Sequence, residues 1–176
     1  MDIFQIDDHG QLFISPDIDD WTLLVERGIT AVFDLDEAVD SGVPTRSNQV
    51  LYIYFPFEDA ELPDLHQLHA LAQLGAQLVT HGLRVLVHCG MGHNRSALLA
   101  GVMLTYLGMH GAEAVARLRQ RRHGALYNTT FATYLQTLSS TPALLGRTGA
   151  TLVSVDRPRI IPETLTALLT VGQAGR

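Results

Sequence analysis

The segment from His88 to Ser96 constrains the fold of this chain more than any other part of the sequence. It reads His-Cys-Gly-Met-Gly-His-Asn-Arg-Ser and lies between a short apolar stretch at 83–87 and a long uncharged run that ends at 112. The first stretch predicts a buried strand and the second a buried helix. A glycine-containing loop between a strand and a helix turns its backbone N–H groups inward, in front of the positive end of the helix. The sequence therefore predicts a cradle for a tetrahedral anion.

The same segment contains a candidate nucleophile and a candidate anion ligand. Cys89 is the single cysteine of the chain, which excludes an intrachain disulfide and a four-cysteine zinc site and fits a reducing compartment. The helix start and the Arg95 guanidinium favour a thiolate over a thiol at Cys89. Arg95 is spaced to fold back over the loop, where its planar fork can bind two phosphate oxygens.

Around this loop the sequence predicts alternating strands and helices. We expect a hairpin at 3–15, a short helix capped by Asp17 or Asp19, and a long amphipathic helix that starts at Pro63 and ends at Gly82. Buried strands are predicted at 29–35, 50–55 and 83–87, and further helices at 96–107, 113–122 and 129–138. This order predicts an α/β fold with a central, mostly parallel sheet flanked by helices.

A composition change near 140 predicts a boundary. Residues 1–140 are expected to form the main domain and residues 141–176 a C-terminal extension with a strand at 151–155 and a short helix from Pro162 to Gly172. We expect the extension to pack on the same domain; the alternative is an element for homodimerisation or partner docking.

Composition excludes several other classes of protein. The 176 residues are 47% hydrophobic and 17% charged, as in a compact globule rather than a disordered chain. A formal net charge of -6 argues against general binding to nucleic acid. No stretch has the features of an export signal or a membrane span, so we expect a cytoplasmic protein. All basic residues are arginine, which hints at a GC-rich, bacterial genome.

Residues 88–96 match the H-C-x-x-G-x-x-R-[S/T] phosphate-binding loop (P-loop) of the cysteine-dependent protein-tyrosine and dual-specificity phosphatases. The resemblance extends over roughly residues 10–140, and the compact length resembles the dual-specificity branch. Asp59, in the segment Phe-Pro-Phe-Glu-Asp after a predicted strand, stands where this family keeps its general acid. The stretch 115–122, followed by Asn128 and Phe131, looks like the closing helices of the family.

The resemblance implies a role for each residue of the motif. Cys89 would attack phosphorus to form a phosphocysteine, Asp59 would act as acid and then as base, and Ser96 would hydrogen-bond the departing thiolate. His88 and Asn128 would support the loop. The substrate phosphate would be bound by the loop positions Gly90, Met91, Gly92, His93, Asn94 and Arg95. No metal and no other cofactor is implied, because the cradle supplies the positive charge.

Several alternatives stay open from the sequence. Glu58 is adjacent to Asp59, and Asp64 is a third, weaker candidate for the acid. The substrate is expected to be a phosphorylated protein, but an inositol phosphate, a sugar phosphate, a nucleotide or another small phosphate ester fits the same chemistry. The loop has no lysine or additional arginine, which argues against a polyphosphorylated lipid. An inactive phosphate-binding module is less consistent with the complete set of Cys, Arg and Asp. A sulfurtransferase often lacks the Arg-Ser ending of this loop, and an arsenate reductase usually needs further cysteines, which this chain does not have.

Three other features have ordinary explanations. One predicted helix contains four arginines, Arg117, Arg119, Arg121 and Arg122. We interpret most of them as a solvated face. A role of Arg122 in substrate binding stays open, because it is nearest to the loop before Asn128. His66 and His69 have the spacing of a metal pair but lack a supporting carboxylate pattern. Asp34 and Asp36 at the end of a predicted strand are expected to cap the following loop.

Overall fold

The computed structural model describes residues 1–140 of the chain. Its centre is a five-stranded sheet in the order β1-β2-β5-β3-β4. The strands are β1 (Phe4–Gln5), β2 (Leu12–Ser15), β3 (Ile29–Asp34), β4 (Leu51–Tyr54) and β5 (Arg84–His88). The β1–β2 hairpin is antiparallel, and all other pairs are parallel. The predicted α/β fold with a mostly parallel sheet is confirmed.

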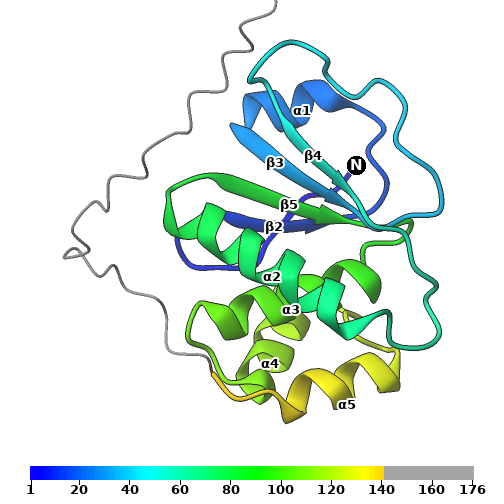
Figure 1. Ribbon diagram of the computed structural model, residues 1–176, viewed down its shortest axis with the longest axis vertical. Coiled ribbons are helices and arrows are strands. Elements are labelled where there is room, and N and C mark those ends of the chain that lie inside the picture. The colour runs from blue at the N-terminus through cyan, green and yellow to red at the C-terminus, as the bar shows by residue number, and fades with distance from the viewer. Residues whose placement is uncertain (141–176) are drawn as a thin grey trace, which may run out of the picture. The chain divides into compact units, whose positions relative to one another are not determined.

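Five helices flank the sheet: α1 (Trp21–Glu26), α2 (Leu65–Thr80), α3 (Arg95–Tyr106), α4 (Gly111–Arg121) and α5 (Thr129–Thr137). Figure 1 shows α1 on one side of the sheet and α2 to α5 on the other. Helix α2 begins after its N-cap Asp64, and the chain leaves it through Gly82, whose φ of 84° suits a residue without a side chain. The N-cap of α1 is Asp20, so the expectation of Asp17 or Asp19 is wrong. Asp17 is used elsewhere, as described below.

Each central strand contributes to two apolar layers. On β5, Val85 and Val87 belong to the larger core cluster, which also contains residues of α2 to α5, whereas Leu86 belongs to the smaller cluster that includes Leu24 of α1. This alternation follows from the two-residue period of a strand. Since both faces are covered, the three central residues of β5, Val85 to Val87, are all apolar rather than alternating with polar residues.

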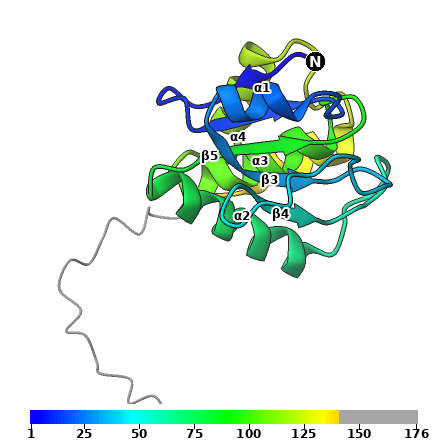
Figure 2. The same ribbon diagram turned by 90° about the horizontal axis from the view of Figure 1, so that it is seen from above.

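Strand β4 differs from its prediction. The apolar residues at 50–55 were expected to form a buried strand, but β4 is the edge of the sheet, and Leu51 and Tyr54 are 43% and 38% exposed. Figure 2 shows β4, β3 and β5 side by side, with β4 outermost. Apolar composition indicates a strand but does not say whether a further strand covers its edge.

The sheet brings three chain segments together at the carboxyl ends of its parallel strands. Ser15 of β2 and Asp34 of β3 are both in register with His88 of β5, so the segments that follow these strands leave the sheet at one place. In open parallel sheets, ligands bind outside these carboxyl ends. The predicted strand at 151–155, the predicted helix from Pro162 to Gly172 and the proposed role of the extension lie outside the described residues.

Candidate active site

The loop between β5 and α3 contains Cys89 at its base. Cys89 is 2% exposed, and its Sγ lies 3.5 Å from the Oγ of Ser96, which is itself fully buried in the first turn of α3. The loop joins the end of a central strand to the N-terminus of a buried 12-residue helix, where unpaired backbone N–H groups favour an anion. The strand–loop–helix arrangement predicted from the sequence is therefore present.

Gly92 allows the loop to pack against the end of β2. Its φ is 63°, and a Cβ at this position would lie 2.6 Å from the backbone carbon of Ser15. Any side chain would collide with the backbone of Ser15 and Pro16, so only glycine fits this close approach. Met91 beside it is 67% exposed and lies on the outer surface of the loop.

The guanidinium of Arg95 is anchored at the end of β3. Its Nη1 donates to the carbonyl oxygen of Leu35 at 2.9 Å and to that of Phe57 at 3.3 Å, and its Nη2 pairs with Oδ1 of Asp36 at 3.0 Å. Its Nε is buried and has no partner within residues 1–140. Arg95 is thus fixed on one side and keeps a free donor, which is what binding of an oxyanion requires.

Asp36 forms a carboxylate pair with Asp17, the residue that was expected to cap α1. The pKa of Asp17 is raised by partial burial and by its hydrogen bond to Asp36. Burial acts on Asp36 in the same direction, but the Glu37 N–H, the charge of Arg95 and the Asp17 bond lower its pKa overall. The carboxyl group next to Arg95 therefore has the lower pKa of the two. From the sequence, Asp36 was expected only to cap a loop, and its contact with Arg95 was missed. The available signal for that contact was the position of Asp36 just after a strand that lies beside β5.

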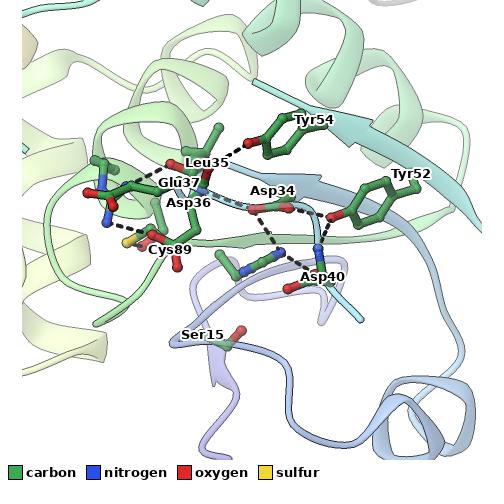
Figure 3. A network of polar contacts seen from close by, with 12 residues as sticks. Ser15, Asp34, Leu35, Asp36, Glu37, Asp40, Tyr52, Tyr54 and Cys89 are labelled. Atoms are coloured by element: carbon green, nitrogen blue, oxygen red, sulfur yellow. Dashed lines mark hydrogen bonds and ion pairs between the residues drawn. The ribbon is translucent and has the colours of Figure 1, made fainter. Parts of the chain in front are cut away.

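His88 contacts two carboxylates of a polar network, Asp34 and Asp40, which Figure 3 shows together with Tyr52. Its Nε2 is 3.0 Å from Oδ2 of Asp40 and 3.6 Å from Oδ1 of Asp34, and both His88 and Asp34 are fully buried. Tyr52 of β4 donates to Asp34 and accepts from the backbone N–H of Asp40 at 3.0 Å. Burial, and then the bond to Asp34, raises the pKa of Tyr52. The network ties the loop after β3 and strand β4 to the residue that precedes Cys89.

The same network contains the one group of potential metal ligands found among the described residues. Asp34, Asp40 and His88 each offer an atom within 4.8 Å of the others. The 3.0 Å separation of His88 and Asp40 is also an ordinary distance between a histidine and a carboxylate, so the position of these side chains needs no metal to account for it. Asp34 additionally accepts the backbone N–H of Asp36 at 2.9 Å, which agrees with the expected capping role.

Asp59 is held by two carboxamides. Its Oδ2 accepts from Nδ2 of Asn94 at 2.8 Å, and its Oδ1 accepts from Nδ2 of Asn128 at 3.1 Å. Asn94 belongs to the loop of Cys89, so the structure brings this carboxylate to the cradle. Among the other acids considered from the sequence, Asp64 caps α2 through a bond to the N–H of Gln67.

The far side of the loop packs against the segment after α4. Arg122 Nη2 lies 2.9 Å from Nε2 of His93 and 3.4 Å from the carbonyl oxygen of Met91, and its guanidinium stacks on the ring of Phe4 at 4.2 Å. Burial and the charge of Arg122 lower the pKa of His93. The ring of Tyr127, which is 63% exposed, lies 5.9 Å from that of His93.

The other arginines of α4 have intramolecular partners. Arg117 and Arg121 pair with Asp8 at the tip of the β1–β2 hairpin, at 2.8 Å and 2.7 Å. Arg119 donates to the carbonyl oxygens of Ala125 and Leu126. Arg119 and Arg121 are nevertheless exposed, which agrees with the interpretation as a solvated face, and the contacts also attach neighbouring segments to α4.

His69 of α2, one of the two histidines with the spacing of a metal pair, is used in contacts between helices. Nδ1 of His69 lies 3.0 Å from the hydroxyl of Tyr106, and its Nε2 lies 2.5 Å from the hydroxyl of Tyr134. Both ring nitrogens are thus used in contacts between α2, α3 and α5.

Within residues 1–140 there is no helix long and apolar enough to cross a membrane.

Comparison with known proteins defines the class to which this fold and loop belong. Residues 12–140 match the family model of the dual specificity phosphatase catalytic domain, and the chain belongs to this family. It is a phosphatase, a hydrolase of phosphoric monoesters.

Individual relatives agree with this class. Mouse protein tyrosine phosphatase type IVA 3 is 30% identical over 115 residues, which are 64% of this chain and 66% of that protein. The crystal structure of Tk-PTP in its active form has a TM-score of 0.61 and 26% identity, covering 76% of this chain and 95% of the other. A mouse putative dual specificity phosphatase complexed with zinc tungstate has a TM-score of 0.64 and 25% identity, covering 76% and 84%.

Proposed function

We propose that this phosphatase hydrolyses phosphate monoesters through a phosphocysteine intermediate on Cys89, and that its substrates are proteins phosphorylated on tyrosine, serine or threonine. The central observation is the placement of Cys89 between a central strand and the N-terminus of α3, beside Ser96 and in the same loop as Arg95. The similarity to a mouse protein tyrosine phosphatase supports the protein substrate.

In the first step, the thiolate sulfur of Cys89 attacks phosphorus. The S–P bond forms while the bond from phosphorus to the ester oxygen breaks, and protonated Asp59 gives its proton to that oxygen. The backbone N–H groups of residues 90–95 and the free Nε of Arg95 bind the phosphoryl oxygens. The Leu35, Phe57 and Asp36 contacts of Arg95 hold its guanidinium in place before substrate binds.

In the second step, water attacks the phosphocysteine. Asp59, now a carboxylate, accepts a proton from the water as the S–P bond breaks, which releases inorganic phosphate and returns the electron pair to sulfur. The hydroxyl of Ser96, 3.5 Å from Sγ, donates a hydrogen bond to the departing thiolate. His88 supports the loop through the network of Asp34 and Asp40. No step needs a metal ion.

The test is hydrolysis of para-nitrophenyl phosphate in the presence of EDTA, followed by a panel of phosphopeptides, inositol phosphates, sugar phosphates and nucleotides. We expect activity in EDTA and the highest kcat/KM on phosphopeptides. Activity confined to small esters would replace the protein substrate with a small-molecule one. A folded protein that binds vanadate but turns over none of these compounds would instead support a phosphate-binding module.

A further inference from the structure

The environment of Asp59 is unusual because both of its carboxylate oxygens accept from the side-chain amides of asparagines. Nδ2 of Asn94 donates to Oδ2 at 2.8 Å, and Nδ2 of Asn128 donates to Oδ1 at 3.1 Å. Asn94 is 1% exposed and lies inside the phosphate loop, whereas Asn128 is the N-cap of α5. The carboxylate thus joins three segments that are distant in sequence.

Backbone donors fix the orientation of both amides. Oδ1 of Asn94 accepts the N–H of Asn128 at 3.0 Å, and Oδ1 of Asn128 accepts the N–H groups of Thr130 and Phe131 at 3.0 Å and 3.2 Å. Only an oxygen can accept these bonds, so the amino group of each asparagine must face Asp59. The arrangement is a specific set of donors and not an accident of two polar side chains in proximity.

Asn128 also holds the segment that contains Asp59. Its Nδ2 donates to the carbonyl oxygen of Ala60 at 3.2 Å, in addition to the carboxylate. Asp59 itself is exposed, so without these bonds its side chain would have several rotamers. The two asparagines therefore restrict both the backbone and the side chain of the acid.

We infer that Asn94 and Asn128 are positioning residues that hold Asp59 against the phosphate loop before substrate binds. The inference rests on the proposed function and adds a specific assignment: the acid is preset by two amides, and one of them belongs to the loop that binds the phosphate. Neither asparagine needs to touch the reacting atoms.

The decisive variants remove the amide and keep the helix cap. Asn128→Ser retains an oxygen that can cap α5 but is too short to reach Asp59. We expect this variant to slow the hydrolysis of phenyl phosphate by about tenfold or more, because phenoxide is a poor leaving group and depends on general acid catalysis. The hydrolysis of an ester with a good leaving group should be much less affected. Asn94→Ser tests the same contact from the phosphate loop.

A double-mutant cycle separates positioning from stability. In the Asp59→Asn background, Asn128→Ser should cause little further loss with phenyl phosphate, because the acid that it positions is already absent. Equal losses for both esters, or a full further loss in the Asp59→Asn background, would show a merely structural role and overturn the inference.

An NMR measurement tests the contact independently of activity. Asp59→Ala should move the side-chain amide signals of Asn94 and Asn128, since their hydrogen-bond acceptor is lost, and Glu58→Ala should leave them in place. Unchanged amide signals in Asp59→Ala would exclude the contact. A wild-type protein that is inactive but shows the expected NMR changes would contradict the proposed function and the positioning role of the two asparagines. It would still confirm their hydrogen bonds to Asp59.

Discussion

Single side chains at the ends of three strands determine what the phosphate loop can do. Arg95 is fixed by the carbonyl oxygens of Leu35 and Phe57 and by the carboxylate of Asp36. These contacts limit the conformational entropy that Arg95 loses when phosphate binds, because its fork is already oriented. The local order of residues 88–96 specifies the nucleophile and the cradle, but the partners of Arg95 are distant in sequence.

Replacement of Asp59 by Asn tests its role as the acid. The variant keeps the size of the side chain but has no proton to give to the leaving group. We expect turnover of phenyl phosphate to fall by about 100-fold or more, and turnover of an ester with a highly acidic leaving alcohol to fall much less. The comparison of the two esters in steady-state kinetics is the measurement, with Glu58→Gln as the matched control. A uniform loss across esters would mean that another residue is the acid.

Among the helices, α4 and α5 approach each other at a glycine. A Cβ on Gly111 would lie 1.8 Å from the carbonyl oxygen of Leu135, whereas a Cβ on Gly75 of α2 would meet the flexible end of Met103 at 2.3 Å. The first obstacle is backbone and the second is a side chain that can move. Such differences in packing are not visible in the sequence, where both residues are simply glycines within predicted helices or next to them.

We therefore expect Gly111→Ala and Gly75→Ala to differ in stability. Gly111→Ala must separate α4 from α5 and should reduce the free energy of unfolding by about 3 kcal/mol or more. Gly75→Ala gains helix propensity and requires only a shift of Met103, so its effect should stay within about 1 kcal/mol. Urea unfolding of both variants provides the comparison. Equal stabilities would contradict the close approach of the two helices.

The fold as a whole was predictable because its strands and helices have strong local patterns. The hairpin, the central strands, the helices and the phosphate loop follow from apolar periodicity, glycines and caps. The edge position of β4, the ion pairs of Asp8 with α4 and the network of His88 depend on which segments become neighbours, which no local pattern specifies. The asparagine contacts of Asp59 belong to this second group, since they join residues from three separate segments.

Two partly buried histidines should also make the stability of the whole molecule depend on pH. Burial lowers the pKa of His69 below its ordinary 6.5, with a further contribution from His66, and burial and Arg122 lower that of His93. As the pH falls through 6.5, the unfolded chain binds protons that the native protein does not, so stability is lost on acidification until the native histidines also titrate.

The pH effect can be assigned by substitution. We expect His69→Gln to reduce the difference in unfolding free energy between a pH above and a pH below the ordinary histidine value. His9→Gln, at an exposed position of the β1–β2 hairpin, serves as the control. A difference that His69→Gln leaves unchanged would contradict the stated cause.

The most direct test of the central assignment is to trap the intermediate. The enzyme is mixed with para-nitrophenyl phosphate, quenched in acid and digested, and the peptide that contains residue 89 is examined by mass spectrometry. We predict a phosphoryl group on Cys89 that accumulates further in Ser96→Ala, and neither adduct nor turnover in Cys89→Ser. Turnover by Cys89→Ser at the wild-type rate would contradict the account.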